Sequence, residues 1–227
     1  MKMAPPAKEE WRHLALLISI LVLFIITPAV VALRHGVLVM NILATIVFVA
    51  GSYALSGRKK LFFVAIVLSA IAVSAAFILL LYPNRWVHLF STCTVIILIS
   101  YFSITILFYV LKGTRVTMDK IFAATCVYLF IGYGWTFAYV LVEELQPKAF
   151  VALSTPSPND YVARVLEMRY FSFATLTTVG YGDIVPHSGA ARTLAVLEAV
   201  TGQIYLTVLI ARLVGLHIVN TGSAKKE

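Results

Sequence analysis

The segment TTVGYGD, at residues 177–183, combines residue types that suit the binding of a dehydrated monovalent cation. Such an ion gives up its water only where oxygen atoms replace it at similar distance and number. Successive backbone carbonyl groups point the same way when the backbone alternates between right- and left-handed conformations. Gly180 and Gly182 allow the left-handed conformation because they have no Cβ. Thr178 adds a hydroxyl group and Tyr181 can turn its ring outward, so the segment predicts a cation-binding strand.

A second Gly-Tyr-Gly tripeptide lies at residues 132–134, within the apolar run VYLFIGYGWTFAYVLV. Its carbonyl groups are expected to be committed to helical hydrogen bonds, and Trp135 rather than an acidic residue follows it. We therefore interpret its glycines as sites of close helix packing and Tyr133 as a packing residue.

The composition places both segments in a membrane protein. Hydrophobic residues make up 61% of the 227 residues and charged residues 12%, with a mean hydropathy of +0.94. A soluble domain carries about twice that charged fraction. Apolar runs of about 20 residues, the length that crosses a bilayer, predict six membrane spans. They lie at 14–33, 37–56, 61–82, 87–111, 121–142 and 190–219.

The stretch between the fifth and sixth predicted spans is different. Residues 143–160 are polar and contain three prolines, and residues 161–178 have the pattern of a short amphipathic helix that Asn159 or Asp160 can cap. Non-helical backbone is tolerated at membrane depth only inside protein or beside water. We therefore expect a re-entrant helix whose negative carboxyl end faces an ion path, followed by a loop.

Basic residues cluster before the first span, after the second, after the fourth and after the sixth. These loops lie on one side of the membrane, so the positive-inside rule predicts cytoplasmic N- and C-termini and an external 143–160 stretch. The net charge of +8 comes from these separate clusters, so no nucleic-acid partner is predicted. Cys93 and Cys126 lie in apolar runs and are expected to be buried thiols.

With its flanking helices, TTVGYGD resembles the selectivity filter of tetrameric potassium channels. The resemblance covers about residues 119–219. It implies an all-α membrane fold in a bacterial plasma membrane, with lipids and three identical subunits as partners and no soluble protein partner. It also implies K⁺ coordination by one group of residues, a filter mouth at Gly182 and Asp183, and a supporting role for Thr177. The coordinating residues are Thr178, Val179, Gly180 and Tyr181.

Residues near the loop match this family with departures. Tyr170 and Phe171 take the aromatic positions behind the filter, where many relatives have two tryptophans. The Tyr170 hydroxyl could reach Asp183 as a brace, or the ring could pack at an interface. Some bacterial relatives bury a carboxylate where this chain has Ala174, so a filter held by that carboxylate is not expected.

The sixth span carries the other candidate residues. Gly202 matches the family's hinge position, with close packing against the re-entrant helix as the alternative. Glu198 is an acid inside a span and therefore a functional candidate. It either hydrogen-bonds Ser172 or Thr175 of the re-entrant helix or serves as a permeation site. Four residues share one helical stripe and are expected to line the central cavity and inner mouth: Gln203, Leu206, Ile210 and Val214.

The six-span layout resembles that of voltage-gated potassium channels, but the fourth span lacks their arginines. Residues 87–111 contain no Arg or Lys, and no acid occurs between Trp11 and Thr117. Voltage dependence needs charges that move through the membrane potential, so weak or no voltage dependence is expected. The predicted domains are a four-helix collar at 1–111, a cytoplasmic linker at 112–120, a pore domain at 121–219 and a short tail at 220–227.

Three alternatives to a potassium channel stay open. One is a weakly selective cation channel of the same build. Another is a transporter, although transporters with this loop resemble four linked repeats and this chain has one. The third is a non-conducting scaffold or an enzyme. The five histidines are scattered and form no catalytic or metal-binding pattern, so no enzyme is predicted, and no cofactor beyond permeant K⁺.

Overall fold

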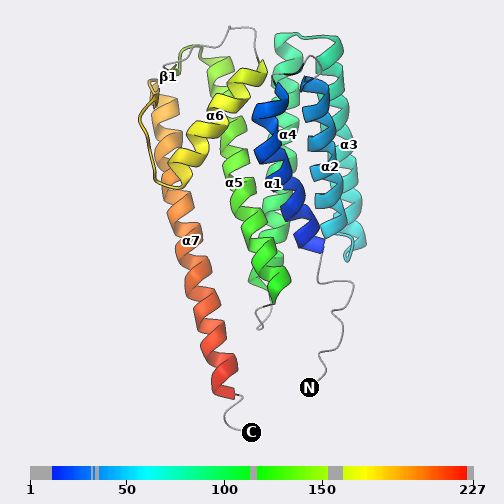
Figure 1. The fold of residues 1–227 in the computed structure, drawn as a ribbon, viewed down its shortest axis with the longest axis vertical. Coiled ribbons are helices and arrows are strands. Elements are labelled where there is room, and N and C mark those ends of the chain that lie inside the picture. Colours follow the sequence, from blue (N-terminus) through cyan, green and yellow to red (C-terminus); the bar gives the residue numbers. More distant parts are fainter. Residues whose placement is uncertain (1–11, 32, 34–35, 113–116, 153–160, 224–227) are drawn as a thin grey trace.

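The computed structural model describes residues 12–31, 33, 36–112, 117–152 and 161–223. Five helices are followed by a short strand, a further helix, a second short strand and a last helix (Figure 1). Their bounds are α1 Arg12–Val31, α2 Gly36–Ala54, α3 Lys59–Leu81, α4 Arg85–Leu111, α5 Met118–Leu145, β1 Phe150–Ala152, α6 Tyr161–Leu176, β2 Ile184–Pro186 and α7 Gly189–Ser223.

Six of these helices, α1 to α5 and α7, are long and apolar enough to cross a membrane. They overlie the six predicted spans, with ends that differ by a few residues, so the predicted six-span α-helical fold is confirmed. In Figure 1, the start of α1 and the end of α7 lie at the same end of the molecule, as an even number of spans requires.

Side-chain caps set where two of the spans begin. The Asn84 side chain accepts a hydrogen bond from the Trp86 amide at the start of α4, and the Thr117 side chain accepts one from the Lys120 amide at the start of α5. Such caps satisfy amide groups that have no partner inside the helix. As a result α5 begins at Met118, and residues 118–120 belong to it rather than to the predicted linker.

Helices α1 to α4 form a bundle that packs on α5. One continuous core joins these five helices, with fully buried Leu16, Leu98, Phe102 and Val127 among its members. Cys126 is buried there as expected, but the prediction for Cys93 was wrong, since it is exposed on α4. An apolar run identifies a span but does not say which of its faces points away from the protein.

Asp119 joins three helices at the end of the molecule where α1 begins. Its Oδ2 lies 2.8 Å from His13 Nδ1 and accepts a hydrogen bond from the Tyr109 hydroxyl at 2.7 Å, while its Oδ1 accepts one from the His13 amide at 3.3 Å. His13 and Asp119 are both buried. This contact ties α1 and α4 to the first turn of α5, and so fixes the bundle to the part of the chain that carries TTVGYGD.

Helix α6 runs obliquely between α5 and α7, and packs against both (Figure 1). It matches the predicted amphipathic helix, while the residues expected to cap it, Asn159 and Asp160, lie outside the described part. Strands β1 and β2 pair antiparallel, with Phe150 opposite Pro186 and Ala152 opposite Ile184. The sequence analysis did not predict this pair, which closes the loop after TTVGYGD against the end of α5.

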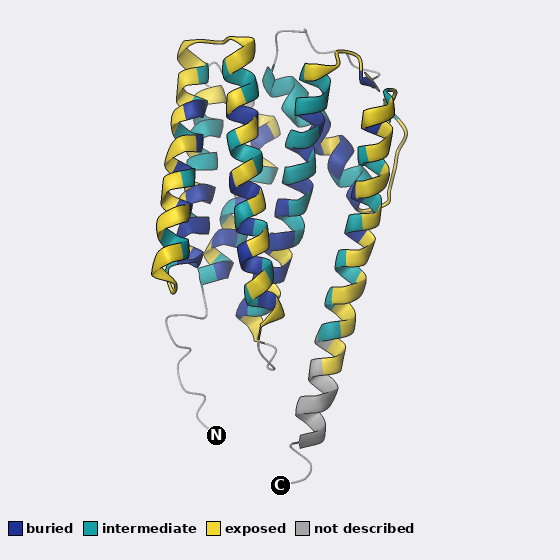
Figure 2. Ribbon diagram, turned by 180° about the vertical axis from the view of Figure 1, so that it is seen from behind, coloured by how far each residue is buried: buried dark blue, intermediate teal, exposed yellow. Residues whose placement is uncertain are grey.

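Helix α7 packs on one side only, against α5, α6 and β2. Figure 2 shows exposed residues along most of its length, whereas the bundle helices turn buried faces toward one another. Large apolar side chains, including Val196, Ile204 and Val208, are about half exposed or more. An apolar face of this extent needs lipid or another protein surface to cover it.

Candidate functional site

The TTVGYGD segment begins where the last turn of α6 unwinds. The Thr178 amide donates to the Thr175 carbonyl oxygen at 3.0 Å, and the amides of Val179 and Gly180 both donate to the Ala174 carbonyl oxygen, at 2.9 and 3.1 Å. These bonds close the carboxyl end of α6 and turn the chain into the extended segment. The position that carries a buried carboxylate in some relatives therefore contributes its backbone here.

Backbone torsion alternates along the segment. Thr178, Gly180 and Gly182 have positive φ values of 62°, 54° and 79°, while Val179 and Tyr181 between them do not. The left-handed conformation predicted for the two glycines is confirmed. Thr178 was not expected, because a β-branched residue rarely adopts positive φ and such strain is concentrated at functional sites. No signal in the residue type identifies it.

One side of the segment is open in the single chain. Val179 is 53% exposed and Tyr181 is 72% exposed, and a Cβ added to Gly180 or Gly182 would meet nothing within 4 Å. Space therefore does not require glycine at these two positions, but the positive φ does.

A phenol and a carboxylate meet beside the segment. The Tyr170 hydroxyl donates to Asp183 Oδ2 at 2.6 Å, and the Asp183 Oδ1 accepts from the Ile184 amide at 3.0 Å. The Tyr170 ring also stacks on the Tyr181 ring, with centroids 6.0 Å apart and planes 8° apart. Of the two sequence interpretations of Tyr170, the brace is the one in agreement with this contact.

This contact changes the proton affinity of both groups. Its hydrogen bond to Asp183 raises the pKa of Tyr170 to about 12, and the same bond lowers the pKa of Asp183 below its usual value. The pair is therefore most stable as a neutral phenol beside an ionised carboxylate.

Phe171, the second aromatic residue of the pair, points away from the segment. Its ring packs edge-on against Tyr139 of α5 and Phe150 of β1, with centroid distances of 5.1 and 5.2 Å. Together the three rings anchor α6 to α5 and to the strand pair. The two adjacent aromatic residues thus have separate contacts, since Tyr170 reaches Asp183 while Phe171 lies in the core.

Glu198 is fully buried between α7, α6 and α5. Its Oε1 lies 2.5 Å from the Ser172 hydroxyl oxygen, and its Oε2 accepts from the Tyr139 hydroxyl at 2.5 Å. The predicted contact with Ser172 is confirmed, whereas Tyr139 was missed. A tyrosine hydroxyl within a span needs a buried partner, and this requirement was the available signal. The carboxyl group is enclosed by the chain rather than placed on the exposed face of α7.

Gly202 lies against the end of α6. A Cβ at this position would be 2.6 Å from the Leu176 carbonyl oxygen and 2.8 Å from its Cδ1. Helix α7 continues unbroken through the glycine. The structure therefore supports close packing as the reason for Gly202, while the hinge stays a prediction.

The first Gly-Tyr-Gly copy lies inside α5 and packs against α6. A Cβ on Gly132 would come within 2.6 Å of the Phe173 ring, and the Gly132 carbonyl oxygen accepts a hydrogen bond from Ser172 at 2.8 Å. Tyr133 packs edge-on against the rings of Phe24 and Phe173. Close helix packing is thus confirmed for Gly132, and Tyr133 is a packing residue.

The four predicted lining residues lie on the open side of α7. Gln203, Ile210 and Val214 are exposed in the single chain, and Leu206 is partly exposed. Their position leaves them available to line a space between α7 and whatever lies opposite it.

Comparisons with known proteins agree with this geometry. A protein-family model described as "Ion channel" matches residues 140–216, from the end of α5 through most of α7. Protein LctB of Bacillus caldotenax is 32% identical over 104 residues, which cover 44% of this chain and 74% of LctB. No solved structure matches the chain significantly.

Two relatives have printed names that state an ion. Two pore potassium channel a of Oryza sativa subsp. japonica is 34% identical over 34% of this chain and 21% of its own length. A voltage-gated potassium channel of Aeropyrum pernix is 34% identical over 27% of this chain and 21% of its own length. The chain thus spans about a fifth of these two relatives and about three quarters of LctB.

Proposed function

This chain belongs to the ion channel family, and from that premise we propose that it is a potassium-selective channel whose filter is the segment TTVGYGD. The observation that carries the proposal is the alternation of positive φ at Thr178, Gly180 and Gly182 along an exposed strand. Alternating torsion turns successive carbonyl oxygens toward the same side, as replacement of the water around K⁺ requires.

Each residue of the strand has a role in this proposal. The carbonyl groups of Thr178, Val179, Gly180 and Tyr181 bind dehydrated K⁺, and the Thr178 hydroxyl binds it at the inner end. Gly182 and Asp183 form the outer mouth. The carboxyl end of α6 lies next to Thr178, so its partial negative charge favours a cation there.

Four copies of the chain are needed to enclose an ion. One chain supplies one strand, and this strand leaves Val179 and Tyr181 exposed. Three further subunits would cover that side, and would bring the exposed faces of four α7 helices around a central cavity. Gln203, Leu206, Ile210 and Val214 would then line the cavity, while α1 to α4 form a collar around the pore.

The membrane orientation follows from charge. Lys59 and Lys60 lie at the start of α3, and the start of α1 is at this same end of the molecule. Placing this end in the cytoplasm satisfies the positive-inside rule and puts Asp183 on the outside. The protein is thus proposed to lie in a plasma membrane with both termini inside.

Flux measurement on the purified chain tests the proposal. Reconstituted in liposomes, the wild type is expected to release K⁺, and Ba²⁺ is expected to block the release. Gly180→Ala is expected to abolish the flux because alanine is strained at a φ of 54°. Gly189→Ala, at an exposed glycine without positive φ, is the matched control. Absence of Ba²⁺-sensitive flux in the wild type would refute the proposal, and equal Na⁺ flux would favour a weakly selective channel.

A further inference from the structure

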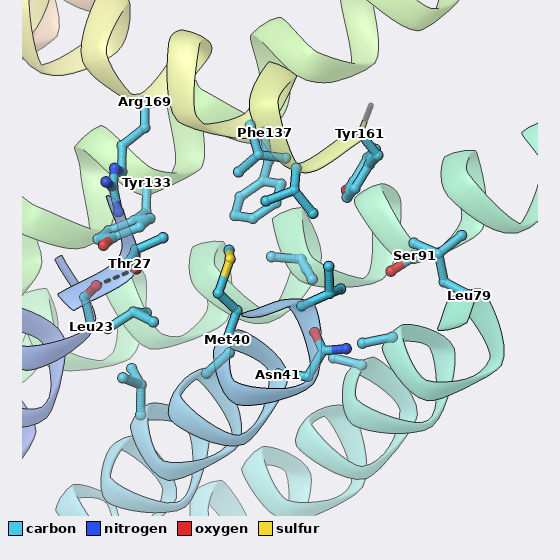
Figure 3. Close-up of a pocket in the computed structure, with 18 of the residues that line it drawn as sticks. Leu23, Thr27, Met40, Asn41, Leu79, Ser91, Tyr133, Phe137, Tyr161 and Arg169 are labelled. Atoms are coloured by element: carbon cyan, nitrogen blue, oxygen red, sulfur yellow. Dashed lines mark hydrogen bonds between the residues drawn. The ribbon is translucent and has the colours of Figure 1, made fainter. Parts of the chain in front are cut away.

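A cavity of about 360 Å³ lies between the bundle of α1 to α4 and the two pore-side helices α5 and α6 (Figure 3). Its volume falls in the range of small-molecule binding sites. Figure 3 shows Met40 and Asn41 of α2 facing Phe137 of α5 and Arg169 of α6 across the space. The cavity is separate from the exposed strand at 177–183.

The lining is mostly aliphatic and aromatic, and Arg169 is the one permanently charged residue in it. Arg169 is only 7% exposed. Its guanidinium carbon lies 4.7 Å from the centroid of the Phe24 ring, a cation–π contact that offsets part of the cost of burial. In the described part of the chain, no carboxylate forms a salt bridge with it.

The neighbouring arginine of α6 shows what is missing. Arg164 does not line the cavity, and it lies 3.8 Å from the Glu144 carboxylate. Beside Arg169, by contrast, Figure 3 shows the Tyr133 ring, whose buried hydroxyl has no hydrogen-bond partner of acceptable geometry among the described residues. A buried charge without a counter-ion is costly, so Arg169 and Tyr133 form an unfilled site for an anionic group.

The two ends of the cavity differ. The end at Arg169 also contains Thr27 and Tyr133, all three buried. The lining residues Val37 and Leu80 are instead 41% and 37% exposed, and they lie at the outer ends of α2 and α3. An occupant would therefore have its charged group inside and its apolar part directed toward the lipid-facing opening.

We propose that this cavity binds a single-chain amphiphile with an anionic head group, which pairs with Arg169 while its alkyl chain fills the aliphatic part. A planar guanidinium suits a carboxylate or a phosphate because it donates two parallel hydrogen bonds. The small volume selects one alkyl chain and excludes a diacyl lipid. This site does not depend on ion conduction.

Equilibrium binding of radiolabelled palmitate to the purified, delipidated full chain tests the proposal, with hexadecanol as the uncharged probe of the same chain length. The wild type is expected to bind palmitate about tenfold more tightly or better, the difference expected for a charge-assisted hydrogen bond. Arg169→Gln is expected to remove that preference, and Ala76→Phe, which fills the aliphatic part, is expected to weaken both probes. Arg164→Gln is the matched control and should leave both affinities unchanged.

Competition experiments identify the head group and the number of alkyl chains. Displacement of palmitate by lysophosphatidic acid would support a site for carboxylates and phosphates, and failure to displace it would support a carboxylate site. Equal wild-type affinity for palmitate and hexadecanol, or a preference that survives Arg169→Gln, would overturn the proposal. So would displacement by diacyl phosphatidylglycerol at equal concentration. If Arg169→Gln fails to fold, the wild-type comparison and Ala76→Phe still decide.

Discussion

Individual hydrogen bonds hold the proposed filter from two sides. On the outer side, Tyr170 donates to Asp183 and stacks on Tyr181. On the inner side, Ser172 connects Glu198 of α7 to the Gly132 carbonyl group of α5. Each contact joins α6 or its loop to a part of the chain that does not bind ions, so each can be changed without touching the ion-binding carbonyl groups.

Tyr170→Phe tests the outer contact, because it removes the hydroxyl and keeps the ring. The bond to Tyr170 lowers the pKa of Asp183, so its stabilising effect is present above the ordinary carboxyl pKa of about 4 and is lost as the pH falls through the lowered value. Without the bond, the pKa of Asp183 rises toward its usual value. Potassium flux measured against external pH should therefore be lost at a higher pH in Tyr170→Phe.

Tyr82→Phe is the control for this change, since Tyr82 is exposed and follows α3. It should leave the acid midpoint of flux where it is in the wild type. An unchanged midpoint in Tyr170→Phe would show that Tyr170 contributes only ring packing.

Glu198 is predicted to carry a proton. Ser172 has one hydroxyl hydrogen, yet its oxygen lies 2.5 Å from Glu198 Oε1 and 2.8 Å from the Gly132 carbonyl oxygen. Both contacts have a hydrogen when Glu198 donates to Ser172 and Ser172 donates to Gly132. Glu198→Gln keeps this pattern and should retain wild-type thermal stability. Glu198→Ala should lose about 2–4 kcal/mol, because it leaves two buried hydroxyl groups without this partner.

Thermal unfolding of the two Glu198 variants in detergent measures this difference. A glutamine variant as unstable as the alanine variant would show that the carboxylate form is required instead.

Residue types predicted part of this site and could not predict the rest. Gly180 and Gly182 identify left-handed backbone because glycine alone adopts it without strain. The same conformation at Thr178 comes from the turn that ends α6, which the residue type opposes. The Tyr139 and Arg169 positions depend on how helices far apart in the sequence pack, so the sequence placed both within helical segments without indicating their partners.

At the scale of elements, the end of α6 is fixed by contact with α7. Gly202 brings the α7 backbone against Leu176, the last residue of α6, two positions before Thr178. Any displacement at this contact would therefore move the start of the proposed filter. Apolar run length predicted these helices well, since a span must satisfy its own backbone hydrogen bonds. It could not predict the β1–β2 pair, whose three-residue strands are too short for a pattern.

Gly202→Ala tests this contact. The added Cβ would lie 2.6 Å from the Leu176 carbonyl oxygen, and forcing it in should cost about 1–3 kcal/mol. Gly215→Ala is the matched control on the same helix, since a Cβ there meets nothing within 4 Å. Thermal unfolding should show Gly202→Ala to be the less stable variant, with reduced K⁺ flux.

Equal stability of these two variants would contradict the packing role. Together with altered gating, it would favour the hinge interpretation of Gly202.

At the scale of the whole molecule, the collar resembles a voltage sensor in layout but not in charge. Arg85 lies in the first turn of α4, where its Nη2 donates to the Glu144 carbonyl oxygen at 3.3 Å, and residues 86–111 contain no Lys or Arg. The six spans and the loop between the last two could be predicted from hydropathy. The cavity beneath α6 could not, because it arises from the spacing of five packed helices.

Gating charge measures whether the collar senses voltage. Each charge that crosses 100 mV contributes about 2.3 kcal/mol, so a collar without mobile charges should give a gating charge below about one per subunit. Current recorded from planar bilayers over a range of voltages should therefore vary weakly. Several gating charges per channel would show that charged residues outside the described spans move through the field.

Reversal potentials in mixed K⁺ and Na⁺ solutions test the central claim most directly. For a filter of backbone carbonyl groups that binds dehydrated K⁺, the reversal potential should follow the K⁺ gradient. It should shift by about 59 mV for each tenfold change in K⁺ concentration, the value for one charge, and replacing K⁺ by Na⁺ on one side should move it strongly. A reversal potential that stays near zero when Na⁺ replaces K⁺ would contradict a potassium-selective filter at residues 177–183.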